Sequence, residues 1–214
     1  MCPLSSQWLD SKAERETYWR RRSGQCRFSP GLAYGRHLGP PLPSARQAAV
    51  MILIEPREGH WSIPLTVRPQ HLPDHAGQVC LPGGRLEPGE SHALAAQREF
   101  CEELGLEDFP AHILGPLQSL WVFNSDFHLT PYLAVAEHTM TYRPSPSEVA
   151  QIVHLPVAHL LDTSTHNQRQ HQRGQVRWSA LGIDVADQHI WGATAMVLGE
   201  LAELLRPLFV SDFV

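Results

Sequence analysis

The chain has 214 residues, of which 43% are hydrophobic and 18% are charged, and its formal net charge at pH 7 is −5. This length allows one substantial core, and no apolar run approaches the roughly 18 residues that span a bilayer. The composition therefore predicts a soluble globular protein with no membrane partner. It also excludes a disulfide scaffold, because the four cysteines form no C-x-x-C pair.

The charge is unevenly distributed. Residues 1–37 hold seven Lys or Arg against three Asp or Glu, whereas the remaining residues hold ten against nineteen. An acidic body argues against nucleic acid as the main partner. Arg20–Arg22 resembles the start of a twin-arginine export signal, but no apolar segment follows it. We therefore expect a cytoplasmic protein.

The first 45 residues predict an N-terminal extension. Residues 5–22 combine capping residues with apolar positions that fit a short amphipathic helix. Residues 38–47 then contain three prolines and are typical of a linker. This places an extension and linker at 1–45 and a single catalytic domain at 46–214.

The domain begins with two predicted strands. Residues 48–55, AAVMILIE, are rich in β-branched residues and fit a buried strand. Residues 61–68 predict its neighbour across a turn, although Pro64 favours an edge position or a bulge there.

Residues 91–105 predict a well-punctuated helix. Ser91 is suited to the N-cap and Gly105 to the C-cap. The expected apolar stripe consists of Ala93, Leu94, Phe100, Cys101 and Leu104.

The C-terminal half predicts several further strands and a closing helix. Strands are expected at 112–123, 127–137, 148–156, 176–183 and 188–192, helices at 157–161 and 193–206, and a polar loop at 164–175. Because strands and helices do not alternate regularly, the pattern predicts an α/β sandwich on a mixed sheet.

Three glutamates crowd one face of the helix at 91–105. Glu99, Glu102 and Glu103 lie within about 100° of one another, where each like-charge pair costs roughly 0.2–0.5 kcal/mol. Hard divalent cations prefer oxygen ligands, so this cluster suits Mg²⁺. The alternative is an ordinary solvated helix face.

The residues before the helix extend this cluster. Gly83 and Gly84 allow the backbone to approach an ion or a phosphate closely. Arg98 can hold Glu90 or a neighbouring carboxylate through a charge-assisted fork. The arginines Arg169, Arg173 and Arg177 could contact phosphates, but we favour a mobile surface loop around them.

These residues together match a known motif. Gly84, Glu90, the pair Arg98–Glu99, Phe100 and the run Glu102–Leu106 have the identities and spacing of the Nudix box. The chain therefore resembles the Nudix hydrolases. The resemblance implies the Nudix fold, an α/β/α sandwich with a mixed β-sheet, and Mg²⁺-dependent hydrolysis of a nucleoside diphosphate linked to another moiety.

The resemblance also suggests individual roles. Glu99 and Glu103 are expected to ligate Mg²⁺ directly, with Glu102 completing the set directly or through water, and Mn²⁺ is expected to substitute. Glu102 and Glu148 are the two candidates for the general base, although Glu148 also fits an exposed loop residue. Arg98 is assigned to the catalytic group, whereas Glu90 and Gly105 are expected to be structural.

A second resemblance is to the coenzyme A pyrophosphatase branch of this family. It is carried by residues 46–50, 65–84, 146–161 and 189–195. Arg68, Gly83 and Gly84 are the expected substrate-binding residues. The products would then be 3′,5′-ADP and 4′-phosphopantetheine.

The chain departs from the branch pattern at Pro69, Pro73 and Leu81, and Asp74 adds a negative charge beside the second of these. One alternative is therefore a Nudix pyrophosphatase that acts on ADP-ribose or on a dinucleotide such as NADH. Another is a non-catalytic Nudix module that binds a nucleotide. In each case the partner is a small-molecule nucleotide, and a homodimer is allowed.

Overall fold

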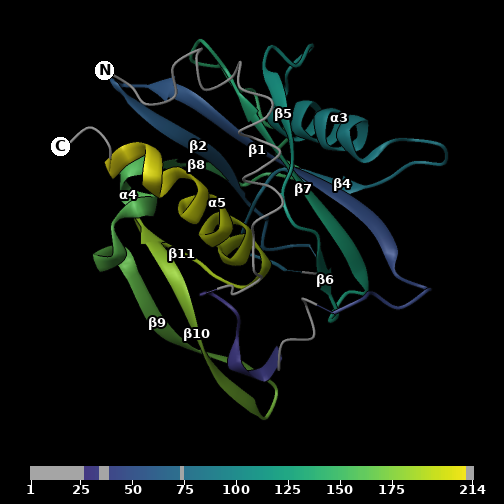
Figure 1. The fold of residues 1–214 in the computed structure, drawn as a ribbon. Helices are drawn as coiled ribbons and strands as arrows, with labels where there is room; N and C mark the ends of the chain where they lie inside the picture. The colour runs from purple at the N-terminus through teal and green to yellow at the C-terminus, as the bar shows by residue number, and fades with distance from the viewer. Residues whose placement is uncertain (1–26, 34–38, 73–74, 211–214) are drawn as a thin grey trace.

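The computed structural model describes residues 27–33, 39–72 and 75–210 (Figure 1). The helix predicted within residues 5–22 lies outside the described residues. Within the described ranges, no helix is long and apolar enough to cross a membrane.

The long strand β1 (Arg46–Arg57) organises the main sheet. Its first nine residues pair in parallel with β7 (Phe127–Val135), and its last three pair antiparallel with β2 (His60–Val67). A parallel and an antiparallel neighbour on one strand confirm the predicted mixed sheet. The turn between β1 and β2 uses Glu58 and Gly59, both of which have a positive φ.

Five shorter strands complete this sheet. They are β3 (Val79–Cys80), β4 (Gly83–Arg85), β5 (His112–Pro116), β6 (Leu120–Val122) and β8 (Gln151–Pro156). β4 pairs with β1, β8 and β3 pair with β2, and β5 and β6 pair with β7. The sheet therefore brings the glycine-rich segment onto β1, directly beside the helix that carries the glutamates.

Side-chain alternation along β1 creates a core on each face of the sheet. Ala49, Met51 and Leu53 pack against α3 (His92–Leu104), whereas Val50, Ile52 and Ile54 belong to the larger cluster under α5 (Gly192–Val210). Figure 1 shows the two helices on opposite sides of the sheet. The period of two in a β-strand thus produces the predicted α/β/α sandwich.

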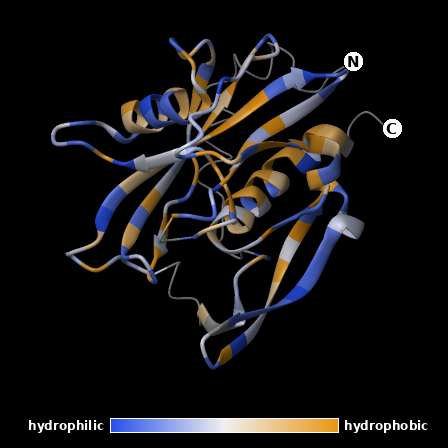
Figure 2. Cartoon of the chain, turned by 180° about the vertical axis from the view of Figure 1, so that it is seen from behind, coloured by the Kyte–Doolittle hydropathy of each residue, from blue (hydrophilic) through white to orange (hydrophobic). Residues whose placement is uncertain are grey.

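A second, three-stranded sheet corrects the predicted polar loop at 164–175. After α4 (Val157–Leu161) and the 3₁₀ turn η3 (Thr163–Thr165), the chain forms β9 (His166–Arg173), β10 (Val176–Val185) and β11 (Gln188–Ile190). β9 pairs with β10 along its whole length and lies at the sheet edge. Figure 2 shows β9 as hydrophilic. An edge strand needs no apolar face, so its polar sequence was misleading.

This sheet also changes the context of the arginines assigned to that loop. Arg169 and Arg173 lie in β9 and Arg177 lies in β10. Arg169 bonds Asp184 at 2.8 Å and Arg177 bonds Gln172 at 3.1 Å. The predicted loop is therefore wrong, whereas the predicted surface location holds for Arg169 and Arg177, which are exposed.

Pro64 does not make β2 an edge strand. β2 pairs with β1 up to Ser62, with β3 from Thr66, and with β8 along its other side. Pro64 stands in the interval between the β1 and β3 pairings, so its missing N–H leaves the β1 and β3 ladders intact.

Helix α3 confirms both predicted caps but shifts the predicted stripe. Ser91 accepts a hydrogen bond from the Leu94 N–H, and Gly105 adopts the left-handed conformation with φ 67°. The buried face consists of Ala95, Ala96, Phe100, Glu103 and Leu104. Leu94 is 57% exposed, because it lies on the side of α3 that faces away from β1.

The segment before residue 46 contributes to the core. Phe28 is 1% exposed, contacts the His166 ring edge-on at 5.0 Å between centroids, and occupies the space left by Gly199 of α5. Ala33, at the end of the 3₁₀ turn η1 (Gly31–Ala33), is also buried. The domain boundary at 45/46 stays a prediction, but packing of the fold extends upstream of it.

We predict that Phe28→Ala lowers the free energy of unfolding by about 3–5 kcal/mol, the usual cost of an aromatic cavity. The melting temperature should fall by on the order of 10 °C. Leu94→Ala, which removes an exposed side chain, is the control and should change it little. An unchanged melting temperature in the Phe28 variant would contradict the packing described here.

Candidate active site

Helix α3 is fixed at both ends, and this determines where its glutamates point. The Ser91 cap holds the start of the helix. At the other end, a Cβ on Gly105 would collide with the backbone carbonyl of Arg143, so only glycine fits there. The Glu103 carbonyl also accepts a hydrogen bond from the Ser145 N–H. These contacts tie the helix to the 143–148 segment that carries Glu148.

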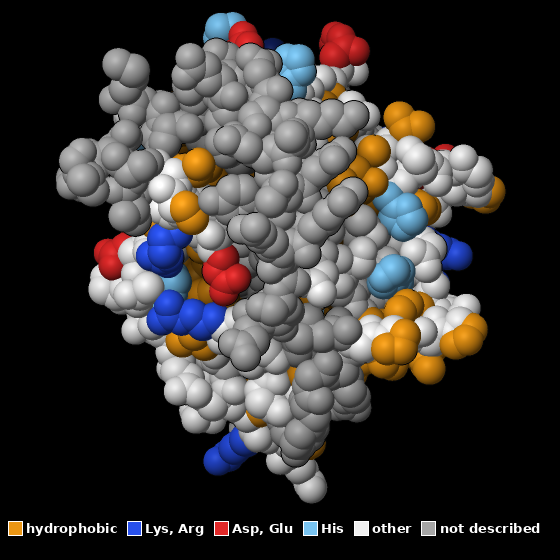
Figure 3. Space-filling view, viewed as in Figure 1, with side chains coloured by type: hydrophobic (Ala, Val, Ile, Leu, Met, Phe, Trp, Pro, Cys, Tyr) orange, Lys and Arg blue, Asp and Glu red, His pale blue; other side chains and the backbone are white. Residues whose placement is uncertain are grey.

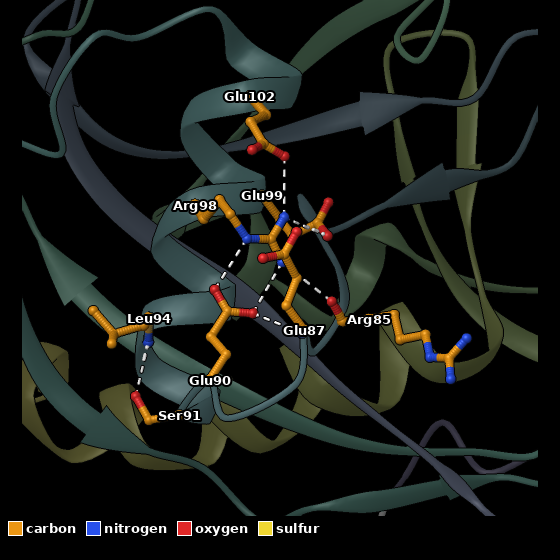
Figure 4. Close-up of polar contacts among 8 residues, drawn as sticks. All are labelled: Arg85, Glu87, Glu90, Ser91, Leu94, Arg98, Glu99 and Glu102. Atoms are coloured by element: carbon orange, nitrogen blue, oxygen red, sulfur yellow. Dashed lines mark hydrogen bonds and ion pairs between the residues drawn. The ribbon is translucent and has the colours of Figure 1, made fainter.

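Arg98 is the centre of a network of acceptors (Figure 4). Its Nε and Nη2 atoms form a fork on Glu90, at 3.0 and 3.1 Å. Its Nη1 atom contacts Glu99 at 2.9 Å and Glu102 at 3.1 Å, and Nη2 also donates to the backbone carbonyl of Arg85 in β4. One guanidinium therefore holds three carboxylates and a strand.

Glu90 joins the loop to the helix through this fork. Its carboxylate also accepts a hydrogen bond from the Glu87 N–H at 2.9 Å. Hydrogen bonding to Arg98, and then to this backbone N–H, lowers the pKa of Glu90 below its ordinary value. Glu90, which was assigned a structural role, therefore stays ionised. Its bond to the Glu87 N–H closes the turn that precedes α3.

The glycine pair at 83 and 84 makes room for close packing. A Cβ on Gly84 would lie against the carboxylate of Glu99, and one on Gly83, whose φ is 153°, would collide with the backbone of β1 at Ala49 and Val50. Glycine at both positions therefore lets α3 and β4 approach β1 closely.

Glu103 is the buried member of the glutamate cluster, with 9% exposure. Its two carboxylate oxygens accept bonds from the Thr66 hydroxyl at 3.4 Å and from the Gly83 N–H at 3.5 Å. Both distances are at the long limit for hydrogen bonds. Burial, reinforced by the charges of Glu99 and Glu148, raises the pKa of Glu103 to about 8.

The other predicted residues lie around this carboxylate. Burial raises the pKa of Glu99, helped by the charges of Glu102 and Glu148 and opposed by Arg98. The positive charge of Arg68 opposes part of the rise in the pKa of Glu103. Because these charges act on one another, the fold brings Glu148, from the turn before β8, and Arg68, at the end of β2, to the same place as the helix glutamates.

This set of residues fits a divalent cation. As the side chains stand, no group of three Asp, Glu, His or Cys converges on a single point within the described chain. Arg98 holds Glu99 and Glu102, and the Glu102 side chain is 56% exposed. The donor chemistry nevertheless fits a hard divalent cation, because the buried Glu103 has only long hydrogen bonds and has carboxylates for neighbours.

A large cleft opens beside Glu103. It has a volume of about 1230 Å³, which exceeds the roughly 300–1,000 Å³ of ordinary small-molecule pockets. Its catalytic end is lined by Thr66, Arg68, Gly83 and Glu103, and its far end by β9, β10 and the start of α5. Gly84 does not line it; Glu90, Arg98 and Glu99 line a separate, smaller groove of about 750 Å³ on the outer side of the loop.

The sequence interpretation missed several residues of this cleft. Thr66 was not singled out, although it lies in the segment 65–84 that resembles the coenzyme A branch. Trp121 and Trp178 were assigned only to strands, although both line the cleft. A sequence signal did exist for Trp191, because it lies in the segment 189–195 that resembles the coenzyme A branch.

Charged side chains of both signs stand on the face of the molecule that Figure 3 shows. On the face in Figure 3, the basic side chains of the described residues stand in small groups beside acidic and histidine side chains.

Comparison with known proteins links this geometry to a family. Residues 45–178 match the NUDIX domain family. The chain is 33% identical over 161 residues to the uncharacterized Nudix hydrolase NudL of Yersinia enterocolitica, covering 75% of this chain and 82% of that protein. NudL of Yersinia pestis is 31% identical over 159 residues, covering 74% and 79%.

Solved structures show the same fold. The Nudix hydrolase RenU of M. smegmatis has a TM-score of 0.50 at 18% identity, covering 79% of this chain and 88% of RenU. A MutT/nudix family protein of Enterococcus faecalis has a TM-score of 0.51 at 15% identity, covering 92% and 75%. At this identity the likeness concerns the fold alone.

The raised pKa of Glu103 predicts an unusual pH dependence of stability without metal. Because the unfolded chain releases this proton near the ordinary value of 4.5 and the folded chain only near 8, the folded state binds more protons between these values. Stability from this group therefore falls as the pH rises through this window, by at most about 1.4 kcal/mol per pH unit.

Glu103→Gln should lose this slope, so in chelator it should gain stability relative to the unsubstituted protein between pH 5 and 8. Denaturant melts at several pH values measure the difference. Glu107→Gln, on the exposed end of the same segment, is the matched control. If the free energy of unfolding changed with pH equally in Glu103→Gln and in the unsubstituted protein, the raised pKa of the buried Glu103 would be refuted.

Proposed function

Because the chain belongs to the Nudix family and is a pyrophosphatase-type hydrolase, we propose that its substrate is a nucleoside diphosphate derivative and that Glu99, Glu102 and Glu103 hold Mg²⁺ for the reaction. The family uses divalent metal ions in general; the choice of Mg²⁺, with Mn²⁺ as a substitute, follows from the carboxylate donors. A bound ion supplies positive charge to the diphosphate oxygens and acidifies water. The observation that carries the proposal is the buried, weakly bonded Glu103 at the floor of a large cleft.

The residues around the ion site would divide the remaining work. Glu148 is exposed and close enough to raise the pKa of both Glu99 and Glu103, which makes it the better supported of the two candidate bases. Glu102 is engaged by Arg98. Arg98 itself acts as a positioning residue, because its contacts are with carboxylates and the β4 backbone. Arg68 lines the cleft beside Glu103 and suits a phosphate oxygen.

Within this class we propose coenzyme A or an acyl derivative as the substrate, cleaved to 3′,5′-ADP and phosphopantetheine. Two segments that resemble the coenzyme A branch, residues 65–84 and 189–195, are far apart in sequence. Both line the cleft that reaches Glu103, through Arg68 and Cys80 from the first and Trp191 and Thr194 from the second. A shared cleft supports a shared role in substrate binding.

ADP-ribose or a dinucleotide remains the alternative substrate. Leu81, which stands where the branch pattern has Phe, is 5% exposed and lines the cleft, so the departure alters the cleft itself. Pro69 is buried beside Arg68. The departures at Pro73 and Asp74 lie outside the described residues.

We expect Glu99→Gln and Glu103→Gln each to reduce turnover at least about 100-fold, because each removes metal charge without removing core volume. Turnover is measured at saturating Mg²⁺, with circular dichroism to verify folding. Glu107→Gln should keep the unsubstituted rate. Full activity in either cluster variant would refute the metal assignment.

A substrate panel with identified products tests the choice of substrate. Coenzyme A should be hydrolysed with a higher kcat/KM than ADP-ribose or NADH, and its products should be 3′,5′-ADP and phosphopantetheine. A preference for ADP-ribose or NADH would transfer the assignment to the alternative. Binding of nucleotides with no turnover of any diphosphate would instead indicate a non-catalytic module.

A further inference from the structure

The second sheet presents a group of flat aromatic rings to the cleft. His171 of β9 and Trp178 of β10 are direct partners across the strand pair, and Trp191 follows β11. The His171 ring lies 4.0 Å from that of Trp191 and 5.8 Å from that of Trp178, at interplanar angles of 29° and 22°. We call these three residues the aromatic wall. All three are half-buried and line the cleft.

The aromatic wall and the catalytic carboxylate share one continuous space. The cleft that contains Glu103 and Arg68 extends to Trp178 and Trp191, and its volume of about 1230 Å³ suits a substrate with two moieties. A diphosphate at the carboxylate end would therefore leave one of its substituents near the second sheet. The chemistry of the wall indicates which substituent that is.

His189 and Asp184 support the aromatic wall. The His189 ring stacks on His171 at 5.8 Å, and its Nδ1 atom lies 2.6 Å from the Asp184 carboxylate. Asp184 also accepts bonds from Arg169 at 2.8 Å and from Asn167 at 2.9 Å. These contacts fix the orientation of the rings before a ligand arrives, which lowers the entropic cost of binding.

The rings offered to a ligand are flat and uncharged, and the two tryptophan rings are inclined at 51° to each other, with 6.1 Å between their centroids. Burial, together with the neighbouring His189 and Arg169, lowers the pKa of His171, so its ring is neutral at neutral pH. Near-parallel tryptophan and imidazole rings favour stacking with another flat ring, a contact that nucleobases make irrespective of identity. An aliphatic chain gains no comparable benefit from their alignment.

We propose that the aromatic wall binds the nucleobase of the substrate by stacking, and that Trp178 and Trp191 thereby select nucleotide diphosphates over diphosphates that lack a base. The inference rests on the proposed function, since it assigns one end of the same cleft. It gives Trp178 and Trp191 the role of specificity residues that do not touch the reacting phosphorus.

Binding of two non-hydrolysable probes by the full chain tests this inference. One probe is the α,β-methylene analogue of ADP, and the other is methylenediphosphonate, which lacks a base. Trp178→Ala and Trp191→Ala should each weaken calorimetric binding of the nucleotide by about 5- to 150-fold, while binding of methylenediphosphonate changes by less than about twofold. Trp178→Phe keeps a flat ring and should retain most of the nucleotide affinity.

Trp61→Ala provides the matched control, because Trp61 packs against the core and does not line the cleft. It should leave both affinities unchanged. Equal weakening of both probes in the wall variants, or no weakening of either, would overturn the inference.

A measurement on the unsubstituted protein avoids dependence on the folding of the variants. An azido-adenine analogue of ADP, activated by light, should label a peptide that contains Trp178 or Trp191. Labelling confined to other peptides would overturn the assignment. These outcomes separate the inference from the proposed function. Nucleotide binding that depends on the tryptophans, without turnover, would refute the proposed activity and support the role of the aromatic wall. Turnover with a KM that does not change in the tryptophan variants would support the activity and refute the role of the aromatic wall.

Discussion

The network around Arg98 is the interaction on which the rest of the site depends. Carboxylates on one helix face repel one another, and the cation that offsets this repulsion comes from the same helix. The fork on Glu90 and the bond to the Arg85 carbonyl connect loop, strand and helix into one unit. The positive charge therefore both balances the cluster and fixes its geometry.

Strand β1 connects this unit to the core. Its side chains alternate between two separate hydrophobic clusters, so the strand is buried on both faces. Glycine at 83 leaves room for the β1 backbone beside β4, and glycine at 84 leaves room for the Glu99 carboxylate of α3. The Gly83 N–H also donates a hydrogen bond to the buried Glu103 carboxylate. The same packing that stabilises the sandwich surrounds Glu103, and its burial raises the pKa of that carboxylate.

The sequence predicted the elements whose signals are local. The caps Ser91 and Gly105, the strand pair around residue 59 and the box spacing all depend on neighbouring residues, and these predictions were confirmed. The sequence did not predict the features that depend on contacts between residues far apart in the chain. β9 has no apolar pattern and exists because β10 pairs with it, and the burial of Phe28 depends on space left by Gly199. The contact between Thr66 and Glu103 likewise joins residues 37 positions apart.

The residues proposed for catalysis and those proposed for nucleobase recognition occupy different parts of this architecture. The glutamate cluster and Arg98 lie within residues 45–178, the part that matches the family, on α3 and the main sheet. The aromatic wall crosses the end of that part, since His171 and Trp178 fall inside it and Trp191 falls beyond it. Substitutions in the second sheet can therefore alter which diphosphate is held without disturbing the carboxylates. A rigid catalytic layer facing a separately built sheet allows one hydrolytic mechanism to serve different substrates.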